Sequence, residues 1–382
     1  MKKQKTVVVL VSDQTIPNVM FLKWHFRNNL ATAGTNIVFV STKKMKEKKI
    51  SENILSALSY AENCINKKEV LIVEENDLKA IFQALEKGYA NYCEQTSEWF
   101  VNFTGGTKPM SIATYSFFLG KPGVNLFYQP IGDHLRQLRP EEKIISSDDI
   151  VTLDEYFNAY GISCKYDNSC VRDWGYNSCV YDTVIENTKD FRKQMLVIQN
   201  DNYFKEKMHD KKFLDFENLK AERIVALKEK ENVEIFIDEL VEGIKQFGFN
   251  PQHLESSQQR YITGGWFEEF VYQKIKEEMH LPDDKIALNV RLKKGNGTSN
   301  ELDVVYLDSK NQLHVIECKS FIDENTQKDL LANTLYKIQA VKSELGLFVK
   351  SHLYTMSEIT KDAPIRRAES FDIEIVDGEK LR

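Results

Sequence analysis

Four acidic residues and one lysine near the C-terminus have the types and spacing that cleavage of a phosphodiester requires. One residue separates Glu301 from Asp303, one residue separates Glu317 from Lys319, and Glu268 precedes both pairs. Carboxylate oxygens suit Mg²⁺ or Mn²⁺, and such an ion polarises a phosphoryl oxygen and lowers the pKa of a bound water. Lys319 would orient that water or stabilise the developing negative charge. We therefore expect all five residues to be catalytic, with Glu268, Asp303 and Glu317 as metal ligands.

Two short apolar runs are expected to position the acid pairs. Residues 303–307 (DVVYL) and 313–318 (LHVIEC) predict strands, and the turn-forming residues 308–311 between them predict a hairpin. Because side chains alternate along a strand, the two charged residues of each pair would share one face. If the hairpin brings those faces together, the carboxylates converge.

A helix over residues 264–279 is expected to add a further carboxylate, because apolar residues recur in it at i+3 and i+4 spacings. Glu268 lies on this helix, and the neighbouring Glu269 competes for the same role. A charged pair on a strand is more often a solvated face. Here an apolar run leads directly up to Glu317, which favours a half-buried central strand and a functional site.

The order of these elements resembles the PD-(D/E)xK restriction-endonuclease-like superfamily. A helix with Glu, a strand with Asp and a strand with E-x-K are followed by a predicted helix over residues 325–345 and a predicted strand over residues 346–349. Leu302 stands where the superfamily usually has a proline before the aspartate, at a position that varies within it. The resemblance implies a metal-dependent nuclease domain.

The N-terminal part of the chain has a different rhythm, in which apolar strand-like runs alternate with helical stretches. Such alternation predicts an α/β domain with a mainly parallel, doubly wound, Rossmann-like sheet and helices on both faces. Ligands of such sheets bind at the carboxyl ends of strands, where the strand order reverses. The predicted strands are 7–11, 37–40, 70–73 and 99–103, and the predicted helices are 20–30, 54–65 and 78–92.

Polar, turn-forming residues follow the first and fourth predicted strands. Two glycines after the fourth strand let the backbone approach a ligand closely, and Lys108 with the exposed N–H groups of the following helix would bind an anion. The spacing matches neither a Walker A motif nor G-x-G-x-x-G, and taken alone it fits an ordinary structural turn equally well. The candidate ligand-binding residues are Ser12, Asp13, Gln14, Thr15, Pro17 and Asn18 in the first loop, and Thr104, Gly105, Gly106, Thr107, Lys108 and Met110 in the second.

These two loops resemble those of CARF domains, the sensors of cyclic oligoadenylate in CRISPR-associated ancillary effectors. Over residues 1–140 and 260–382, the chain resembles the CARF-plus-endonuclease effectors of type III CRISPR systems, which cyclic tetra-adenylate activates. The resemblance implies one ligand across a two-fold homodimer, with Lys108 at its phosphates and Gln14 and Asn18 at its bases or ribose hydroxyls. It also implies a DNA substrate, an RNA substrate or both.

Length and composition agree with such a multidomain protein. The 382 residues allow two or three domains. We expect a CARF domain over residues 1–145, a largely helical connector over 146–250, with its charge-rich part at 201–246, and a nuclease domain over 251–382. The formal net charge of −6 argues against a global positive field for nucleic acid. A local basic patch, Arg291, Lys293 and Lys294, fits either a nucleic-acid contact or an ordinary charged hairpin end.

The remaining sequence features exclude several other classes. The six cysteines form no C-x-x-C pair, which favours reduced thiols over a zinc site. No 18-residue apolar span and no signal-peptide pattern occur, so we expect a cytoplasmic protein without membrane contact.

Two rival functions remain open at this point. A non-catalytic sensor that only binds nucleic acid would have no chemical reason to keep Asp303, Glu317 and Lys319 together. A nucleotide-independent repair or restriction nuclease, whose N-terminal domain serves only dimerisation, would not need the polar turn at 104–108.

Overall fold

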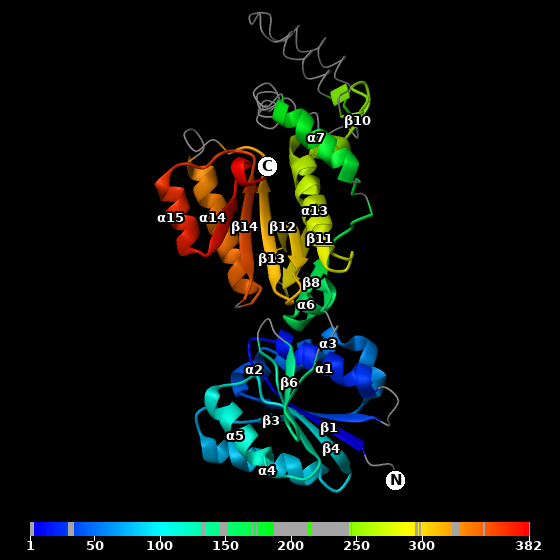
Figure 1. Cartoon of the computed structure of the whole chain (residues 1–382), viewed down its shortest axis with the longest axis vertical. Helices are drawn as coiled ribbons and strands as arrows, with labels where there is room; N and C mark the ends of the chain where they lie inside the picture. Colours follow the sequence, from blue (N-terminus) through cyan, green and yellow to red (C-terminus); the bar gives the residue numbers. More distant parts are fainter. Residues whose placement is uncertain are drawn as a thin grey trace, which may run out of the picture. The chain divides into compact units, whose positions relative to one another are not determined.

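A computed structural model describes residues 4–29, 34–130, 134–145, 151–169, 171–172, 174–186, 213–214, 244–245, 247–294, 297, 299–322, 328–346 and 348–381. The chain, whose helices and strands are labelled in Figure 1, divides into two compact units. The first comprises residues 1–166, 282–315 and 337–351, and the second comprises residues 167–281, 316–336 and 352–382. The predicted connector segment 201–246 lies almost entirely outside the described residues.

The N-terminal sheet has seven strands in the order β3-β2-β1-β4-β5-β6-β7. The five strands from β3 to β5 are parallel, and the sequence predicted four of them. β5 and the antiparallel hairpin of β6 and β7 that extends the sheet were not predicted. The strand order reverses between β1 and β4, so the loops that follow these two strands leave the same edge. The strands are β1 (Gln4–Leu10), β2 (Thr35–Ser41), β3 (Ile65–Ile72), β4 (Thr96–Asn102), β5 (Val124–Tyr128), β6 (Leu135–Arg139) and β7 (Lys143–Ile145).

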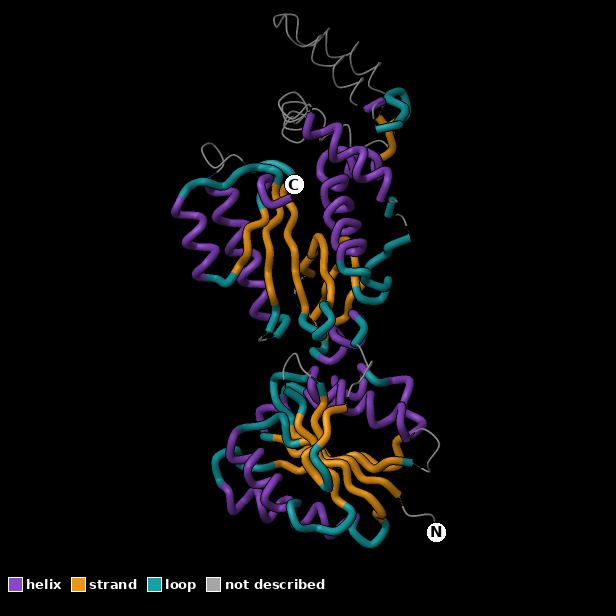
Figure 2. Tube along the Cα trace, in the orientation of Figure 1, coloured by secondary structure: helices purple, strands orange, loops and turns teal. Residues whose placement is uncertain are grey.

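Helices cover both faces of this sheet (Figure 2). On β1, Val7 and Val9 pack into one core cluster with α1 and α3, whereas Val8 and Leu10 pack into another with α4 and α5. Burial of both faces explains why β1 is a continuous apolar run. The predicted helix 54–65 is wrong in extent, because α3 ends at Ala57 and a 3₁₀ helix follows. The helices are α1 (Ile16–Asn29), α2 (Lys43–Glu47), α3 (Ile50–Ala57), η1 (Ser59–Cys64), α4 (Leu78–Tyr92) and α5 (Lys108–Phe118).

The second large sheet has six strands in the order β15-β14-β13-β12-β11-β8, and β11 pairs antiparallel with both β8 and β12. The predicted strands 303–307 and 313–318 are confirmed as β12 and β13. The predicted strand 346–349 is wrong: Gly346 has a left-handed φ of +123°, and the next strand begins only at Lys350. The strands are β8 (Ile162–Lys165), β11 (Ile286–Lys294), β12 (Ser299–Leu307), β13 (Leu313–Lys319), β14 (Lys350–Thr355) and β15 (Ile373–Val376).

The predicted helices in this part of the chain are present with small shifts of their ends. The helix expected at 264–279 is α13, and the one expected at 325–345 is described from Lys328 as α14, residues 325–327 lying outside the described residues. Short strands β9 (Phe213–Leu214) and β10 (Leu254–Glu255) pair antiparallel. No helix in the described ranges is both long and apolar enough to span a bilayer. The helices are α6 (Leu153–Ala159), α7 (Trp174–Glu186), α12 (Ser256–Arg260), η2 (Tyr261–Gly265), α13 (Trp266–Glu278), α14 (Lys328–Glu344), α15 (Asp362–Ser370) and α16 (Gly378–Leu381).

Candidate functional site

Strand β13 carries a buried Glu317 that forms an ion pair with the partly exposed Lys319. Glu317 is only 4 % exposed, and the Nζ atom of Lys319 lies 2.8 Å from its Oε1 atom. The same ammonium group donates to the Cys318 carbonyl at 3.1 Å. A buried carboxylate is costly unless a cation or hydrogen bonds compensate it, and Lys319 supplies that compensation here. Because β13 also lies between β12 and β14, the expectation of a central, half-buried strand is confirmed.

Asp303 lies on β12 at a local irregularity of the sheet. The antiparallel register of β11 and β12 skips Asp303 and Asn289, and Asn289 has a φ of +52°. Leu302 and Val305 pack into the same core cluster, although strict alternation would place them on opposite faces. The alternation is therefore interrupted at Asp303, whose side chain is buried.

Glu301 has a different environment from Asp303. Its side chain is 53 % exposed, and its Oε1 atom lies 3.6 Å from Nε of Arg291 on β11. The simple period-2 argument, which treated the two acids as equivalent, does not capture this difference. The side chains of Asp303 and Glu317 are both buried, whereas that of Glu301 is exposed.

The donor set fits a hard divalent cation. Sheet order makes β12 and β13 neighbours, so adjacent strands carry the two buried carboxylates of Asp303 and Glu317. Within the described part of the chain, no three His, Cys, Asp or Glu side chains form a ready-made metal cage. Mg²⁺ is commonly held by only one or two carboxylates, with water and substrate phosphates completing its shell. Two carboxylates of this kind are therefore sufficient donors for Mg²⁺ or Mn²⁺.

On α13 the two neighbouring glutamates have different surroundings. Glu269 is buried, and it accepts hydrogen bonds from Nη1 and the backbone N–H of Arg172 at 2.8 and 3.1 Å. Burial raises the pKa of Glu269, and the hydrogen bonds and charge of Arg172 act in the opposite direction. The guanidinium of Arg172 also lies over the Tyr261 ring at 3.8 Å. Glu269 is thus engaged with Arg172, while Glu268 is half-buried, and the choice of Glu268 as the helix carboxylate stays a prediction.

In the N-terminal domain, a buried amide network ties the strand ends together. Asn18 is 1 % exposed; its Nδ2 donates to the Leu10 carbonyl at 2.8 Å, and its Oδ1 accepts from Asn102 at 3.2 Å. Asn102 in turn accepts from the backbone N–H of Thr104 at 3.1 Å, and the Thr104 hydroxyl accepts from the Gln129 N–H at 2.7 Å. The network therefore joins the carboxyl ends of β1, β4 and β5, and the side chain of Asn18 serves to hold the loops.

The turn after β4 requires its two glycines. A Cβ on Gly105 would lie 2.2 Å from the carbonyl oxygen of Leu10, and Gly106 has a φ of +75°. Ser111 on α5 donates to the Gly105 carbonyl at 3.0 Å, which fixes the turn against the helix. Lys108, the first residue of α5, is exposed to solvent. The N-terminus of α5 and an exposed lysine are thus presented at the strand-order reversal, as the sequence predicted.

The other predicted loop residues are divided between surface and core. Thr15 and Met110 are fully buried, and Met110 packs in the core with α4. Asp13 is exposed and pairs with Lys48 at 2.6 Å, and the Thr107 hydroxyl donates to the Glu75 carbonyl at 2.8 Å. Ser12 and Gly106 are partly exposed.

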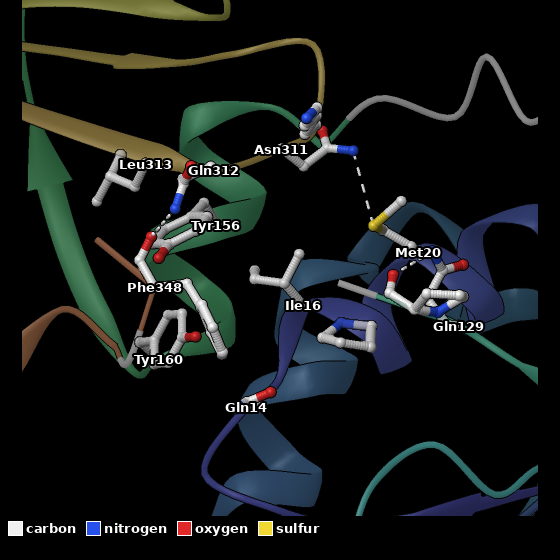
Figure 3. Close-up of a pocket in the computed structure, with 13 residues that line it drawn as sticks. Gln14, Ile16, Met20, Gln129, Tyr156, Tyr160, Asn311, Gln312, Leu313 and Phe348 are labelled. Atoms are coloured by element: carbon white, nitrogen blue, oxygen red, sulfur yellow. Dashed lines mark hydrogen bonds between the residues drawn. The ribbon is translucent and has the colours of Figure 1, made fainter. Parts of the chain in front are cut away.

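Gln14 and Pro17 open into a cavity of about 250 Å³ (Figure 3). Gln129 after β5, Tyr156 of α6 and Tyr160 directly after α6 also line it, as do residues of the β12–β13 turn. The sequence predicted Gln14 and Pro17 as ligand-binding residues but not Gln129, Tyr156 and Tyr160, because these three are far from the first loop along the chain and no local pattern connects them to it. Asn102 could have been noticed, since it is the polar residue that ends an apolar strand, three residues before Gly105.

Comparison with known families identifies three segments of the chain. Residues 6–156 match the model of the Card1 CARF domain, residues 167–256 that of the Card1 hinge domain, and residues 255–382 that of the Card1-like endonuclease domain. The chain therefore combines a CARF domain and an endonuclease domain of the Card1 type. The family resemblance stated from the two sets of motifs is confirmed. The domain limits expected from the sequence, at residues 145 and 250, stay a prediction.

Three solved structures share the fold. Protein VC1899 from Vibrio cholerae gives a TM-score of 0.73 at 17 % identity, over 99 % of this chain and 95 % of that protein. Can2 from Sulfobacillus thermosulfidooxidans, in complex with cyclic tetra-adenylate, gives a TM-score of 0.66 at 20 % identity, over 97 % of this chain and 92 % of Can2. A type III CRISPR defence DNA nuclease activated by cyclic oligoadenylate gives 0.51 at 14 % identity, over 93 % of this chain and 46 % of the nuclease. No curated protein sequence matches the chain significantly.

Proposed function

We propose that this Card1-like endonuclease cuts DNA, RNA or both in antiviral defence, and that cyclic tetra-adenylate switches the cutting on. One observation carries the proposal: a single chain combines a CARF domain, whose Gly-Gly turn lies at the strand-order reversal, with an endonuclease domain that holds a buried Glu317–Lys319 pair. The complex of Can2 with cyclic tetra-adenylate and the oligoadenylate-activated nuclease, both of this fold, support it.

At the nuclease site, the buried carboxylates of Asp303 and Glu317 would hold Mg²⁺ or Mn²⁺, with Glu268 as a third candidate ligand. When bound, the ion lowers the pKa of a water and polarises the scissile phosphate. Lys319 then places a positive charge beside the reacting phosphate, where it orients the nucleophile and stabilises the charge that develops. Glu317 fixes the position of that ammonium group through the 2.8 Å contact.

In the sensor, the ligand would be bound through its phosphates and its bases. Lys108 and the N–H groups at the start of α5 are suited to the phosphates. Gln14 offers an amide at the cavity, and the tyrosines of α6 offer apolar ring surface. A cyclic, symmetric ligand matches a two-fold interface in which the same loops act twice, so we infer a homodimer. The ligand activates by preferring the cutting arrangement of that dimer.

Nucleic acid would be held by local charge. The chain is acidic as a whole, but Lys293 and Lys294 at the end of β11 are exposed, and Arg291 on the same strand is paired with Glu301. These residues are suited to the phosphate backbone, which carries no information on base sequence.

The test is a cleavage assay with purified protein, Mn²⁺, and plasmid, single-stranded DNA and RNA substrates, with and without cyclic tetra-adenylate. We expect cutting only with both metal and ligand, loss of cutting in EDTA, and recovery when Mn²⁺ is restored. Ligand binding without any cutting would instead indicate a regulator. Cutting at the same rate without ligand would indicate a nucleotide-independent nuclease, and robust turnover in EDTA would contradict the metal site.

A further inference from the structure

The cavity at Gln14 has a wall formed by the hairpin turn of the nuclease sheet. Residues 310–313, which join β12 to β13, line it opposite residues 14–20, the loop and first turns of α1 (Figure 3). β12 carries Asp303, and β13 carries Glu317 and Lys319. The candidate ligand loop and the connection between the two candidate catalytic strands therefore contact the same space.

Asn311 fixes this turn by several interactions. It is buried and has a φ of +57°, a conformation that asparagine tolerates better than most residues. Its Oδ1 accepts hydrogen bonds from the Val151 N–H at 2.8 Å and from Nζ of Lys285 at 3.2 Å. Its amide nitrogen lies 3.6 Å from Sδ of Met20 on α1 (Figure 3). One side chain thus links the turn, the start of β11, the segment before α6 and the helix that follows the ligand loop.

Lys285 makes the arrangement sensitive to the loss of Asn311. Lys285 is 4 % exposed, and its ammonium group also donates to the Val151 carbonyl. Burial lowers the pKa of Lys285 to about 8. Without the Asn311 carboxamide, a buried cation loses one of them.

We propose that Asn311 is a positioning residue that transmits ligand binding at the cavity to the β12–β13 hairpin. A ligand that contacts Gln14 and Pro17 acts on the N-terminus of α1, and α1 contacts the turn through Met20. Because hydrogen-bonded strands are stiff, the hairpin follows its turn, and a displacement of the turn therefore moves the strands that carry Asp303, Glu317 and Lys319. The inference rests on the proposed function and adds the route by which its two sites are coupled.

The test uses Asn311→Gly, which keeps the left-handed backbone and removes the side chain. We expect affinity for cyclic tetra-adenylate within about threefold of the unmodified protein and a near-native melting temperature, but at least tenfold less cleavage at saturating ligand. Asn311→Asp keeps the acceptor bonds to Val151 and Lys285 but loses the amide donor to Met20, so its cleavage at saturating ligand should fall as well. Ser309→Ala, an exposed change in the same turn, is the matched control and should behave as the unmodified protein.

Hydrogen exchange separates transmission from simple loss of structure. In the unmodified protein, the ligand should change amide exchange both in the loop after β1 and in the β12–β13 hairpin. In Asn311→Gly, the loop should still respond and the hairpin should not. If that variant does not fold, Lys285→Met, which keeps the volume and removes the donor to Asn311, is measured in the same way.

Two outcomes contradict the inference and are distinguishable. If the ligand activates the unmodified protein and Asn311→Gly equally, or if the hairpin of the variant still responds, the inference alone is wrong. If the unmodified protein binds the ligand but shows neither cleavage nor a change in the hairpin, the proposed function is wrong as well.

Discussion

At the scale of single residues, the buried pair on β13 leads to the most direct prediction. Asp303→Asn, Glu317→Gln and Lys319→Ala should each lower cleavage by on the order of a hundredfold, because each removes charge from the place where the transition state develops it. Glu301→Gln is the matched comparison: Glu301 is exposed, and an exposed ion pair contributes little, so its effect should stay below about fivefold. Initial cleavage rates with Mn²⁺ and saturating ligand measure both, and calorimetry should show unchanged ligand binding. A Glu317→Gln protein with near-native rates would contradict the site.

Substitutions at the two glutamates of α13 should affect different properties: the stability of the protein at Glu269 and the cleavage rate at Glu268. Glu269→Gln removes the negative partner of Arg172 inside the protein and should lower the free energy of unfolding by about 2 kcal/mol, which is less than the cost of breaking a fully buried pair because Arg172 is partly exposed. Glu268→Gln should leave stability nearly unchanged and lower the cleavage rate more strongly. Thermal melts and cleavage assays on the two variants, side by side, decide between the roles. The opposite pattern would move the site to Glu269.

Residue types were the part of the site that the sequence could predict. The acids and the lysine were recognisable because their chemistry is carried by type and short spacing alone. Arg172 and Tyr156 were not, because their roles come from contacts with residues distant in the chain, such as Glu269 and the Leu345 carbonyl. Tertiary packing sets those partners, and a single sequence does not display it.

At the scale of elements, α1 contains a buried histidine that should make the N-terminal domain sensitive to acid. His25 packs edge-on to Phe100 at 4.7 Å and lies 3.3 Å from the Thr35 hydroxyl. Burial, assisted by the charge of Lys5, lowers the pKa of His25 to about 3, against 6.5 in the unfolded chain. Between these values the unfolded state binds more protons than the folded state. The stability that the buried, neutral His25 contributes is therefore complete above pH 6.5 and is lost as the pH falls.

The size of this effect can be measured. From pH 7 to pH 5, the proton uptake of unfolded His25 should cost about 2 kcal/mol, at about 1.4 kcal/mol for each pH unit below 6.5. His25→Phe keeps the aromatic packing and cannot titrate, so it should lose correspondingly less stability over the same range. Urea unfolding of both proteins at the two pH values gives the difference. Equal losses in the two proteins would show that His25 is not the acid-sensitive group.

Helices and strands could be predicted from the sequence where the pattern of apolar residues kept one period along the whole element. The parallel strands and their helices follow the alternation of apolar runs, and the hairpin at 308–311 follows its turn residues. The prediction was wrong at 346–349, where a short apolar run forms a connection with a left-handed Gly346, and incomplete at Asp303, where the face alternation is interrupted opposite Asn289. Local strand propensity does not contain such backbone irregularities, since they depend on the partner strand.

At the scale of the whole molecule, the sensor should determine how much ligand the nuclease needs. Lys108 is exposed at the N-terminus of α5, beside a turn whose glycines bring the backbone close to β1. A charge-assisted hydrogen bond to phosphate is worth about 1.5–3 kcal/mol, so Lys108→Ala should weaken binding of cyclic tetra-adenylate by roughly ten- to a hundredfold. Lys87→Ala, an exposed change in the body of α4, is the control and should bind normally.

The cleavage rate of Lys108→Ala should depend on the ligand concentration, and calorimetry gives the number of chains that bind one ligand. At limiting ligand, Lys108→Ala should abolish most cleavage, and at high ligand much of the rate should return, because Asp303, Glu317 and Lys319 are untouched. If the pocket lies on a two-fold axis, calorimetry should give one ligand for two chains, and the two Lys108 residues of a dimer should both act on it. One ligand per chain, or a Lys108→Ala protein activated as easily as the unmodified one, would place the sensor elsewhere in the molecule.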